Sequence, residues 1–285
     1  MLRQISTTSA GYTSVKLPVG ALEGFLTALV PTSVASKLHN LVCLPSIFSS
    51  VAHEFQFQFA SSQLERHFAL YGIELQAPEH DFGRASIERD AAQVLRAADA
   101  LKLEQFSLLG SSHGANVSAV LAATHPERIS RLVLVNSNAF VSSEDVEDMK
   151  ERHNVRLWPK EMREAAMAKL GADSLQDKWS AMVKALHQVE REDGGDLICS
   201  HLPHINCKTL VVSGGKNTFM PAFHGEYLSE RIVHSRLEVL SNGGNDLITS
   251  EATRFNMLLE TFLNEPDDRL TQSREFVAVP TRKGN

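Results

Sequence analysis

The sequence predicts an α/β protein in which a mostly parallel sheet is covered by helices on both faces. Short apolar, β-branched runs alternate along most of the chain with longer stretches of helical periodicity, the pattern of a parallel sheet with helical crossovers. Between the runs that end at Asn136 and begin at Thr209 the pattern is helical only, which indicates an insertion. The length of 285 residues suits a single domain enlarged in this way.

The elements are expected in the following order. An opening pair of strands precedes the first buried parallel strand, and five more strands follow it: Thr13–Val19, Leu22–Val30, Asn40–Leu44, Phe68–Leu75, Phe106–Gly110, Arg131–Asn136, Thr209–Ser213 and Arg236–Leu240. Helices are expected at Ala85–Ala100, Gly114–His125, Pro221–Val233 and Glu251–Leu263. Ser86 is the expected N-cap of the first helix, because a periodic apolar stripe follows it.

These elements divide the chain into a split core, a cap and two ends. The insertion is expected to form a helical cap, with Ser143, Pro159 and Ser174 as successive start signals. The expected segments are a flexible N-terminus at 1–12, core at 13–138, cap at 139–202, core at 203–264 and a disordered tail at 265–285. The N-terminal segment carries Arg3 and no acid, so a mitochondrial signal is the alternative to a flexible end.

Composition excludes several classes of protein. A hydrophobic content of 43% allows a substantial core, and the net charge of −6 argues against a nucleic-acid partner. No apolar run approaches the roughly 20 residues of a membrane span. The three cysteines are scattered, which indicates neither a disulfide framework nor a metal site, and no metal or cofactor is expected. An intracellular location follows, cytoplasmic in preference to mitochondrial.

One motif carries chemical information. Residues 110–114 read Gly-Ser-Ser-His-Gly, which fits G-x-S-x-G between a strand and a helix. This pattern is typical of a nucleophile elbow, where the glycines allow the tight turn that presents Ser112. In the alternative interpretation the glycines only allow close strand–helix packing and Ser112 caps the helix.

The stretch FSLLGSSHGANVSAVLAATHPERISRLVLVNSNAF resembles the α/β-hydrolase fold. Further likeness, in SSEDVEDM, DLICSHLPHINCKTLVVSG and PAFHGEYL, is to the valacyclovir hydrolase (biphenyl hydrolase-like) family and covers about residues 13 to 264. The resemblance implies a serine hydrolase that cleaves esters, with a Ser…Asp…His triad and a helical cap. It makes Trp158 and Trp179 of the insertion, together with His113, candidates for the pocket.

The sequence departs from that family at the catalytic loops. Ser112 matches the nucleophile, but Asn217 stands at the position of the acid and Asn245 at that of the base. An amide neither accepts a proton near neutral pH nor supplies the charge that orients and stabilises a base. The oxyanion-hole region, expected at Ser46, Ile47 and His113, lacks the usual glycine, and Glu74–Glu79 lacks the arginine and glycines of D-x-R-G-x-G.

Replacement of the triad by other residues is the open alternative. All 12 histidines lie at or before His234, so none follows the last strand. His113 adjoins Ser112, but neighbouring side chains on a helix diverge. The family resemblance of the segment around His224 implies a structural position for that residue. Asp246 should point away from the site if Asn245 points into it.

Three hypotheses result. The favoured one is a catalytically inactive or strongly impaired pseudo-hydrolase that binds a small molecule or a protein partner. The second is a weak or rewired serine ester hydrolase that uses Ser112 with a non-standard base. The third is a largely vestigial structural protein or interaction module with a filled pocket. Fold alone does not choose among them, because function resides in the site.

Overall fold

A computed structural model describes residues 3–9, 11–20, 24–33, 38–76 and 82–266 of the chain. Its nine-stranded sheet has the order β1-β2-β3-β5-β4-β6-β7-β8-β9. The strands are β1 (Arg3–Ser9), β2 (Tyr12–Gly20), β3 (Gly24–Pro31), β4 (His39–Leu44), β5 (Phe68–Ile73), β6 (Phe106–Ser111), β7 (Ile129–Val135), β8 (Lys208–Gly214) and β9 (Ser235–Leu240). Pairing is antiparallel from β1 to β5 through β2 and β3, and parallel among β5, β4, β6, β7, β8 and β9.

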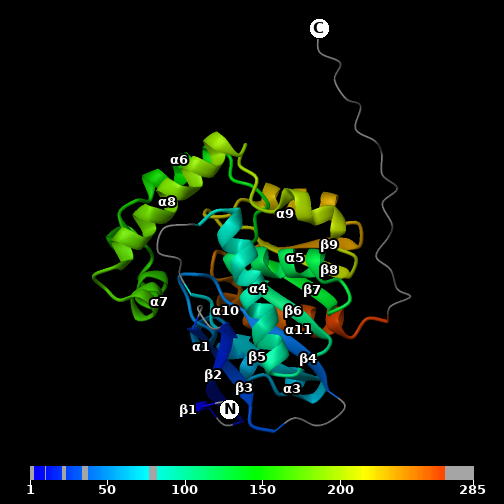
Figure 1. Cartoon of the computed structure of the whole chain (residues 1–285). Coiled ribbons are helices and arrows are strands. Elements are labelled where there is room, and N and C mark those ends of the chain that lie inside the picture. Colours follow the sequence, from blue (N-terminus) through cyan, green and yellow to red (C-terminus); the bar gives the residue numbers. More distant parts are fainter. Residues whose placement is uncertain (1–2, 10, 21–23, 34–37, 77–81, 267–285) are drawn as a thin grey trace.

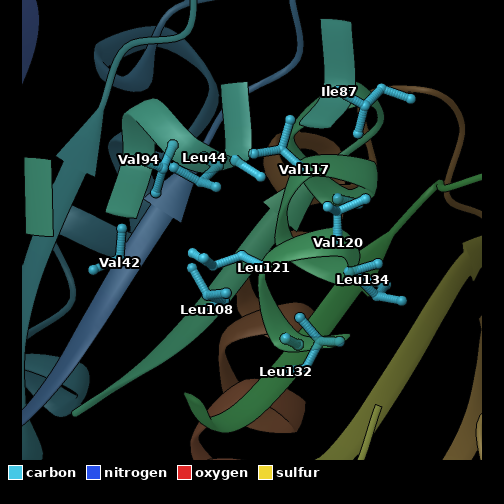
Figure 2. Packing of buried hydrophobic residues seen from close by; sticks show 14 of the residues in the cluster. Val42, Leu44, Ile87, Val94, Leu108, Val117, Val120, Leu121, Leu132 and Leu134 are labelled. Atoms are coloured by element: carbon cyan, nitrogen blue, oxygen red, sulfur yellow. The ribbon is translucent and has the colours of Figure 1, made fainter. Parts of the chain in front are cut away.

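Helices cover both faces of the sheet, as the sequence predicts (Figure 1). The main covering helices are α4 (Arg84–Ala100), α5 (His113–Thr124), α9 (Ala222–Arg231) and α11 (Ala252–Leu263). Alternate residues of β4 serve the two layers, because side chains along a strand point to opposite faces. Val42 and Leu44 join the cluster that contains α4 and α5 (Figure 2), whereas Leu41 and Cys43 join the one that contains α11. The α/β architecture is therefore confirmed.

The N-terminal segment differs from the flexible end that the sequence predicts at residues 1–12. Residues Arg3–Ser9 form β1, which pairs with β2 in antiparallel register. Gly11 lies in the connecting turn with a φ of 98°, a conformation that glycine adopts readily. The β-branched content of RQISTTS suits a strand, and the low apolar content of this segment hid the signal.

The start of α4 also differs from the expectation. Its N-cap is Gly83, so the helix begins two residues before Ser86. The Ser86 hydroxyl lies inside the first turn and donates to the Gly83 carbonyl at 2.8 Å. Three short helices were not expected: α1 (Val51–Glu54), α2 (Gln56–Phe59) and α3 (Ser62–His67). They connect β4 to β5 and are too short to show helical periodicity.

The helical insertion projects as a separate lobe beside the sheet (Figure 1). It contains α6 (Ser143–Glu151), α7 (Lys160–Leu170) and α8 (Leu175–Glu192), and short 3₁₀ turns lie at Val155–Leu157 and Cys199–His204. A β-bridge between Phe140 and Asp196 closes its base. Its own apolar cluster is built around Trp158 and Trp179. The insertion is thus a small packed unit on the core.

The first two residues of the tail that the sequence predicts to be disordered, Glu265 and Pro266, are bound to the core. Arg236 Nη1 contacts Glu265 Oε1 at 2.6 Å, Lys208 Nζ donates to the Pro266 carbonyl at 2.5 Å, and Arg131 donates to the Glu265 carbonyl. The disorder expected from residue 265 therefore does not begin there. Residues 267–285 lie outside the described residues.

A buried pair joins the cap to the core. His224 Nε2 in α9 lies 3.0 Å from Asp145 Oδ1 in α6, and both side chains are almost fully buried. The other oxygen, Oδ2, accepts from the backbone N–H and the hydroxyl of Ser142. Burial alone would raise the pKa of Asp145, but the hydrogen bonds from His224 and Ser142 outweigh it and lower that pKa below 3.8. The carboxylate therefore stabilises the docked cap while it is ionised.

The variant Asp145→Asn should lose about 2 kcal/mol of unfolding free energy at neutral pH, because a charge-assisted buried hydrogen bond is removed. A carboxyl whose folded pKa is lowered stabilises the fold above its unfolded pKa, and this contribution disappears as pH falls through the folded value. The difference in unfolding free energy between the variant and the native protein should thus become smaller as the pH falls below 3.8, the ordinary pKa of an aspartate. Denaturant titrations at neutral and acidic pH measure it, with the exposed neighbour Glu144→Gln as control. An equal difference in unfolding free energy at neutral and acidic pH contradicts the prediction.

Candidate active site

Ser112 occupies a strained turn between β6 and α5. Its φ and ψ are 51° and −118°, a conformation that non-glycine residues rarely adopt. A Cβ on Gly110 would lie 2.4 Å from the Gly114 carbonyl oxygen, and a Cβ on Gly114 would lie 2.2 Å from that of Leu44. Both glycines are thus required by backbone contacts. The turn has the geometry of a nucleophile elbow.

Asn217 follows β8 and is buried. Its Oδ1 accepts hydrogen bonds from the backbone N–H groups of Phe219 and Met220 at 3.0 and 3.1 Å. Its Nδ2 is buried and has no hydrogen-bond partner among the described residues. The amide oxygen therefore holds the Asn217 loop, and the loop presents Phe219 and Met220, rather than Asn217 itself, to the cavity beside Ser112.

Asn245 follows β9 and lines the same cavity as Ser112. The loop that carries it is fixed by Asn136, a residue that sequence reasoning did not identify. Asn136 Nδ2 donates to the backbone carbonyls of Gly244 and Asn245, both at 3.2 Å, and its Oδ1 accepts from the Gly214 N–H at 3.0 Å. One side chain at the end of β7 therefore ties together the loops after β8 and β9, which carry Asn217 and Asn245.

The oxyanion region contains a carboxyl group that sequence reasoning also missed. Glu54 of α1 lines the cavity, and its Oε2 accepts the backbone N–H of Ser46 at 2.9 Å. Burial raises the pKa of Glu54, and hydrogen bonds from Ser111 and Ser46 oppose this only in part. The N–H of Ser46, expected near an oxyanion, is thus already bonded. Ile47 lines the cavity beside it.

His113 lines the cavity and pairs with an acid. Its Nε2 lies 2.8 Å from Asp90 Oδ2, and the two side chains are 13% and 6% exposed. The position of His113 at the first turn of α5 brings it to the wall of the cavity beside Ser112. The structure thus places an imidazole–carboxylate pair next to the elbow.

Glu74 begins the segment where the sequence lacks D-x-R-G-x-G. It accepts the Val51 N–H at 2.8 Å and forms an ion pair with Lys169 of α7. The cap is thus held at the end of β5 as well as at α9. Within the segment Glu74–Glu79, residues 77–79 lie outside the described residues.

The cavity has a volume of about 140 Å³ and lies between the core and the cap. It is lined by Ser112 and by other serine and asparagine residues of the core, and also by cap residues that include Met149, Met162 and Trp179. Trp158 is not among the lining residues. It packs edge-to-face on Trp179, with ring centroids 4.8 Å apart. The cap therefore covers the end of the sheet where Ser112 lies.

Neither a metal-binding cluster nor a membrane-spanning helix is found among the described residues. No cluster of three or more His, Cys, Asp or Glu side chains that could hold a metal occurs among the described residues. None of the helices described is long and apolar enough to cross a membrane.

Comparisons with known proteins identify the family and the fold. A family model described as alpha/beta hydrolase fold matches residues 58–193. Serine hydrolase BPHL of Mus musculus is 30% identical over 266 residues, which cover 91% of this chain and 89% of the mouse protein. Serine hydrolase BPHL of Homo sapiens is 32% identical over 187 residues, or 65% of this chain and 64% of the human protein.

Solved structures share the fold at lower identity. The enol-lactonase from Burkholderia xenovorans LB400 superposes with a TM-score of 0.66 at 21% identity, over 87% of this chain and 100% of that one. The 2-hydroxy-6-oxo-6-phenylhexa-2,4-dienoate hydrolase from Rhodococcus sp. strain RHA1 gives 0.68 at 16% identity, over 93% and 100%. Given the mouse relative, which matches nearly the whole chain, this protein belongs to the α/β-hydrolase family that includes the serine hydrolase BPHL.

Proposed function

We propose that this chain is a catalytically inactive or strongly impaired hydrolase that keeps the capped cavity to bind a small molecule. The observation that carries the proposal is the chemistry of Asn217 and Asn245, two neutral amides at the positions where the family resemblance expects the acid and the base. Without a base, the Ser112 hydroxyl is a poor nucleophile, and loss of a triad base typically costs on the order of 10⁶-fold in turnover.

The contacts of the surrounding loops support the same conclusion. The Asn217 oxygen already accepts from Phe219 N–H and Met220 N–H, and the amide is neutral, so Asn217 offers a histidine neither a free acceptor nor a charge. The Ser46 N–H is bonded to Glu54, so a developing oxyanion would compete with a carboxyl group for that donor. The cavity is small and lies between the core and the cap, which favours a small molecule over a protein partner.

A rewired serine hydrolase is the second candidate. The observation in its favour is the His113–Asp90 pair on the cavity wall, because an imidazole oriented by a carboxylate is the ordinary activator of serine. Against it, His113 directly follows Ser112, and its Nε2 is already engaged by Asp90. One experiment separates the two candidates.

The native protein should hydrolyse p-nitrophenyl acetate and valine esters no faster than Ser112→Ala, because the serine lacks a base. Initial rates of the two purified proteins, corrected for the uncatalysed reaction, make the comparison. A fluorophosphonate probe should likewise label Ser112 slowly or not at all. A serine-dependent turnover above about 1 s⁻¹, the low end for ordinary enzymes, contradicts the proposal. Loss of such activity in His113→Gln would then identify the rewired base.

A further inference from the structure

The last strand, β9, leaves one edge of the sheet open. It ends the strand order, and among the described residues only β8 pairs with it. On that side, two backbone N–H groups donate to the carbonyls of His234 and Leu240 at 2.8 and 2.9 Å. Backbone groups of successive strand residues point alternately to the two sides of the strand, so the even-numbered residues of β9 face β8. The N–H and C=O groups of Ser235, Leu237 and Val239 therefore point outward, where another strand can pair with them.

Symmetry limits how a second copy of the chain can use this edge. Two identical edges related by a two-fold axis pair antiparallel, and each outward residue must face an outward residue of the other strand. The possible registers therefore differ in steps of two residues. The register centred on Leu237 uses all three outward residues, because Leu237 faces its own copy and Ser235 faces Val239. Val239 is 41% exposed in the single chain, and this pairing covers part of it.

The charges of β9 favour the same register. Arg236 lies over the Phe262 ring of α11, and Glu238, two residues further on, lies on the same face of the sheet. In the register centred on Leu237, Arg236 of each chain faces Glu238 of the other, which gives two cross-strand pairs of opposite charge. A shift of two residues places Arg236 opposite Arg236 in one direction and Glu238 opposite Glu238 in the other. Like charges directly opposite are destabilising, so β9 is complementary to itself in one register.

Both charged side chains can reach a second chain. Glu238 is partly exposed and forms no ion pair with another described residue. Arg236 contacts Glu265 at 2.6 Å, yet its side chain keeps 28% exposure. Charged residues on an edge strand normally keep other strands away. These two would repel most strands and accept one that carries the opposite charges at the facing positions.

We propose that β9 is the interaction surface for a second copy of this chain, and that the two copies pair antiparallel about Leu237 into one continuous sheet. The two β9 strands then run in opposite directions, so the sheet ends that carry Ser112 point away from each other. The caps and cavities therefore lie at opposite ends of the dimer. Dimer formation and ester hydrolysis are independent properties, because no residue of β9 is among the described residues that line the cavity.

Sedimentation equilibrium of the full chain tests the pairing. Concentrations between about 1 µM and 1 mM, which bracket the affinities of transient interfaces, should show a reversible equilibrium between monomer and dimer. Glu238→Lys should raise the dimer dissociation constant about 10-fold or more, because both cross-strand pairs become repulsive. The control is Glu164→Lys, which makes the same change of charge at an exposed position of α7 and should leave the constant unchanged. A native chain that stays monomeric throughout, or equal effects of the two variants, overturns the inference.

A mixture of two variants separates specific pairing from general repulsion. Arg236→Glu should also weaken the dimer, because a glutamate then faces Glu238 of the other chain. Mixed with Glu238→Lys, each chain meets opposite charges at both facing positions, so the mixture should pair more tightly than either variant alone. Circular dichroism shows whether Arg236→Glu stays folded without the contact to Glu265. Two folded variants that do not pair with each other overturn the register.

Hydrogen exchange of the native chain locates the surface without any substitution, and decides the register if Arg236→Glu does not fold. The amides of Leu237 and Val239 should exchange slowly at high protein concentration and rapidly at low concentration, because they are bonded only in the dimer. The Glu238 amide, which faces β8, should be protected at both. Protection of Leu237 and Val239 at every concentration would mean that a segment of the same chain covers the edge. A dimer in which both stay unprotected would form through another surface, and either result overturns the inference.

Discussion

The double variant Asn217→Asp, Asn245→His should hydrolyse small esters about 10³-fold faster than the native chain. Restoring a base and its orienting acid addresses a deficit on the order of 10⁶-fold. The bonded Ser46 N–H limits the recovery, since one missing oxyanion donor costs on the order of 10²- to 10³-fold. A measurable but poor esterase is the expected product.

The local contacts favour this rescue at both positions. An aspartate at 217 can accept the Phe219 and Met220 N–H groups with one oxygen and offer the other to an imidazole. It also removes the unpartnered Nδ2 of the native amide. The loop that carries position 245 is fixed by Asn136 and lines the cavity with Ser112. A histidine there would therefore start from a held backbone.

The single variants are the controls for the rescue. Neither Asn217→Asp nor Asn245→His alone should reach the rate of the double variant, because triad members act as a unit. Adding Ser112→Ala to the double variant should return the rate to that of the native chain. A folded double variant without serine-dependent activity would mean that these two asparagines do not hold the former acid and base positions.

Replacing Gly114 with alanine should destabilise the fold by at least about 3 kcal/mol, within the range of severe overpacking. The added Cβ would lie 2.2 Å from the Leu44 carbonyl oxygen and 2.6 Å from that of Pro45. Both are backbone atoms at the end of β4, which cannot rotate away as a flexible side chain could. Relief would require α5 to move away from the strand and from the oxyanion region.

The variant Gly194→Ala is the matched control for Gly114→Ala. Gly194 has a φ of 62°, and an added Cβ there meets no atom within 4 Å. Only backbone strain should appear, at about 1 kcal/mol. Denaturant unfolding of both variants gives the comparison. Losses of similar size would show that the close contact at Gly114 is not the main source of its destabilisation.

The buried strands could be predicted from the sequence because burial on both faces makes them continuous apolar runs between turn residues. Phe68–Ile73 and Phe106–Ser111 are buried along their whole lengths. The helices α1 to α3 could not be predicted, because four to six residues do not complete a periodic pattern. The start of α4 was misplaced because Gly83, not the more usual serine, precedes it.

The elbow could be predicted because all of its requirements are local. Gly110, Ser112 and Gly114 lie within one turn, so their spacing alone indicates the geometry. Glu54 and Asn136 act on groups that only the folded chain brings near. The Glu54 carboxyl group accepts a hydrogen bond from the Ser46 N–H. The Asn136 side chain bonds to loops more than 70 residues away in the sequence, as in its contact with the Gly214 N–H. No spacing rule signals such contacts.

The confinement of both tryptophans to the cap affects how unfolding of this protein can be followed. Trp158 and Trp179 belong to an apolar cluster separate from the two clusters that pack the sheet. Intrinsic fluorescence therefore reports on the environment of the cap, whereas far-ultraviolet circular dichroism averages over the whole chain. If the cap loses its packing before the sheet does, the two signals will give different midpoints. The fluorescence midpoint then measures the cohesion of the lobe that lines one side of the cavity.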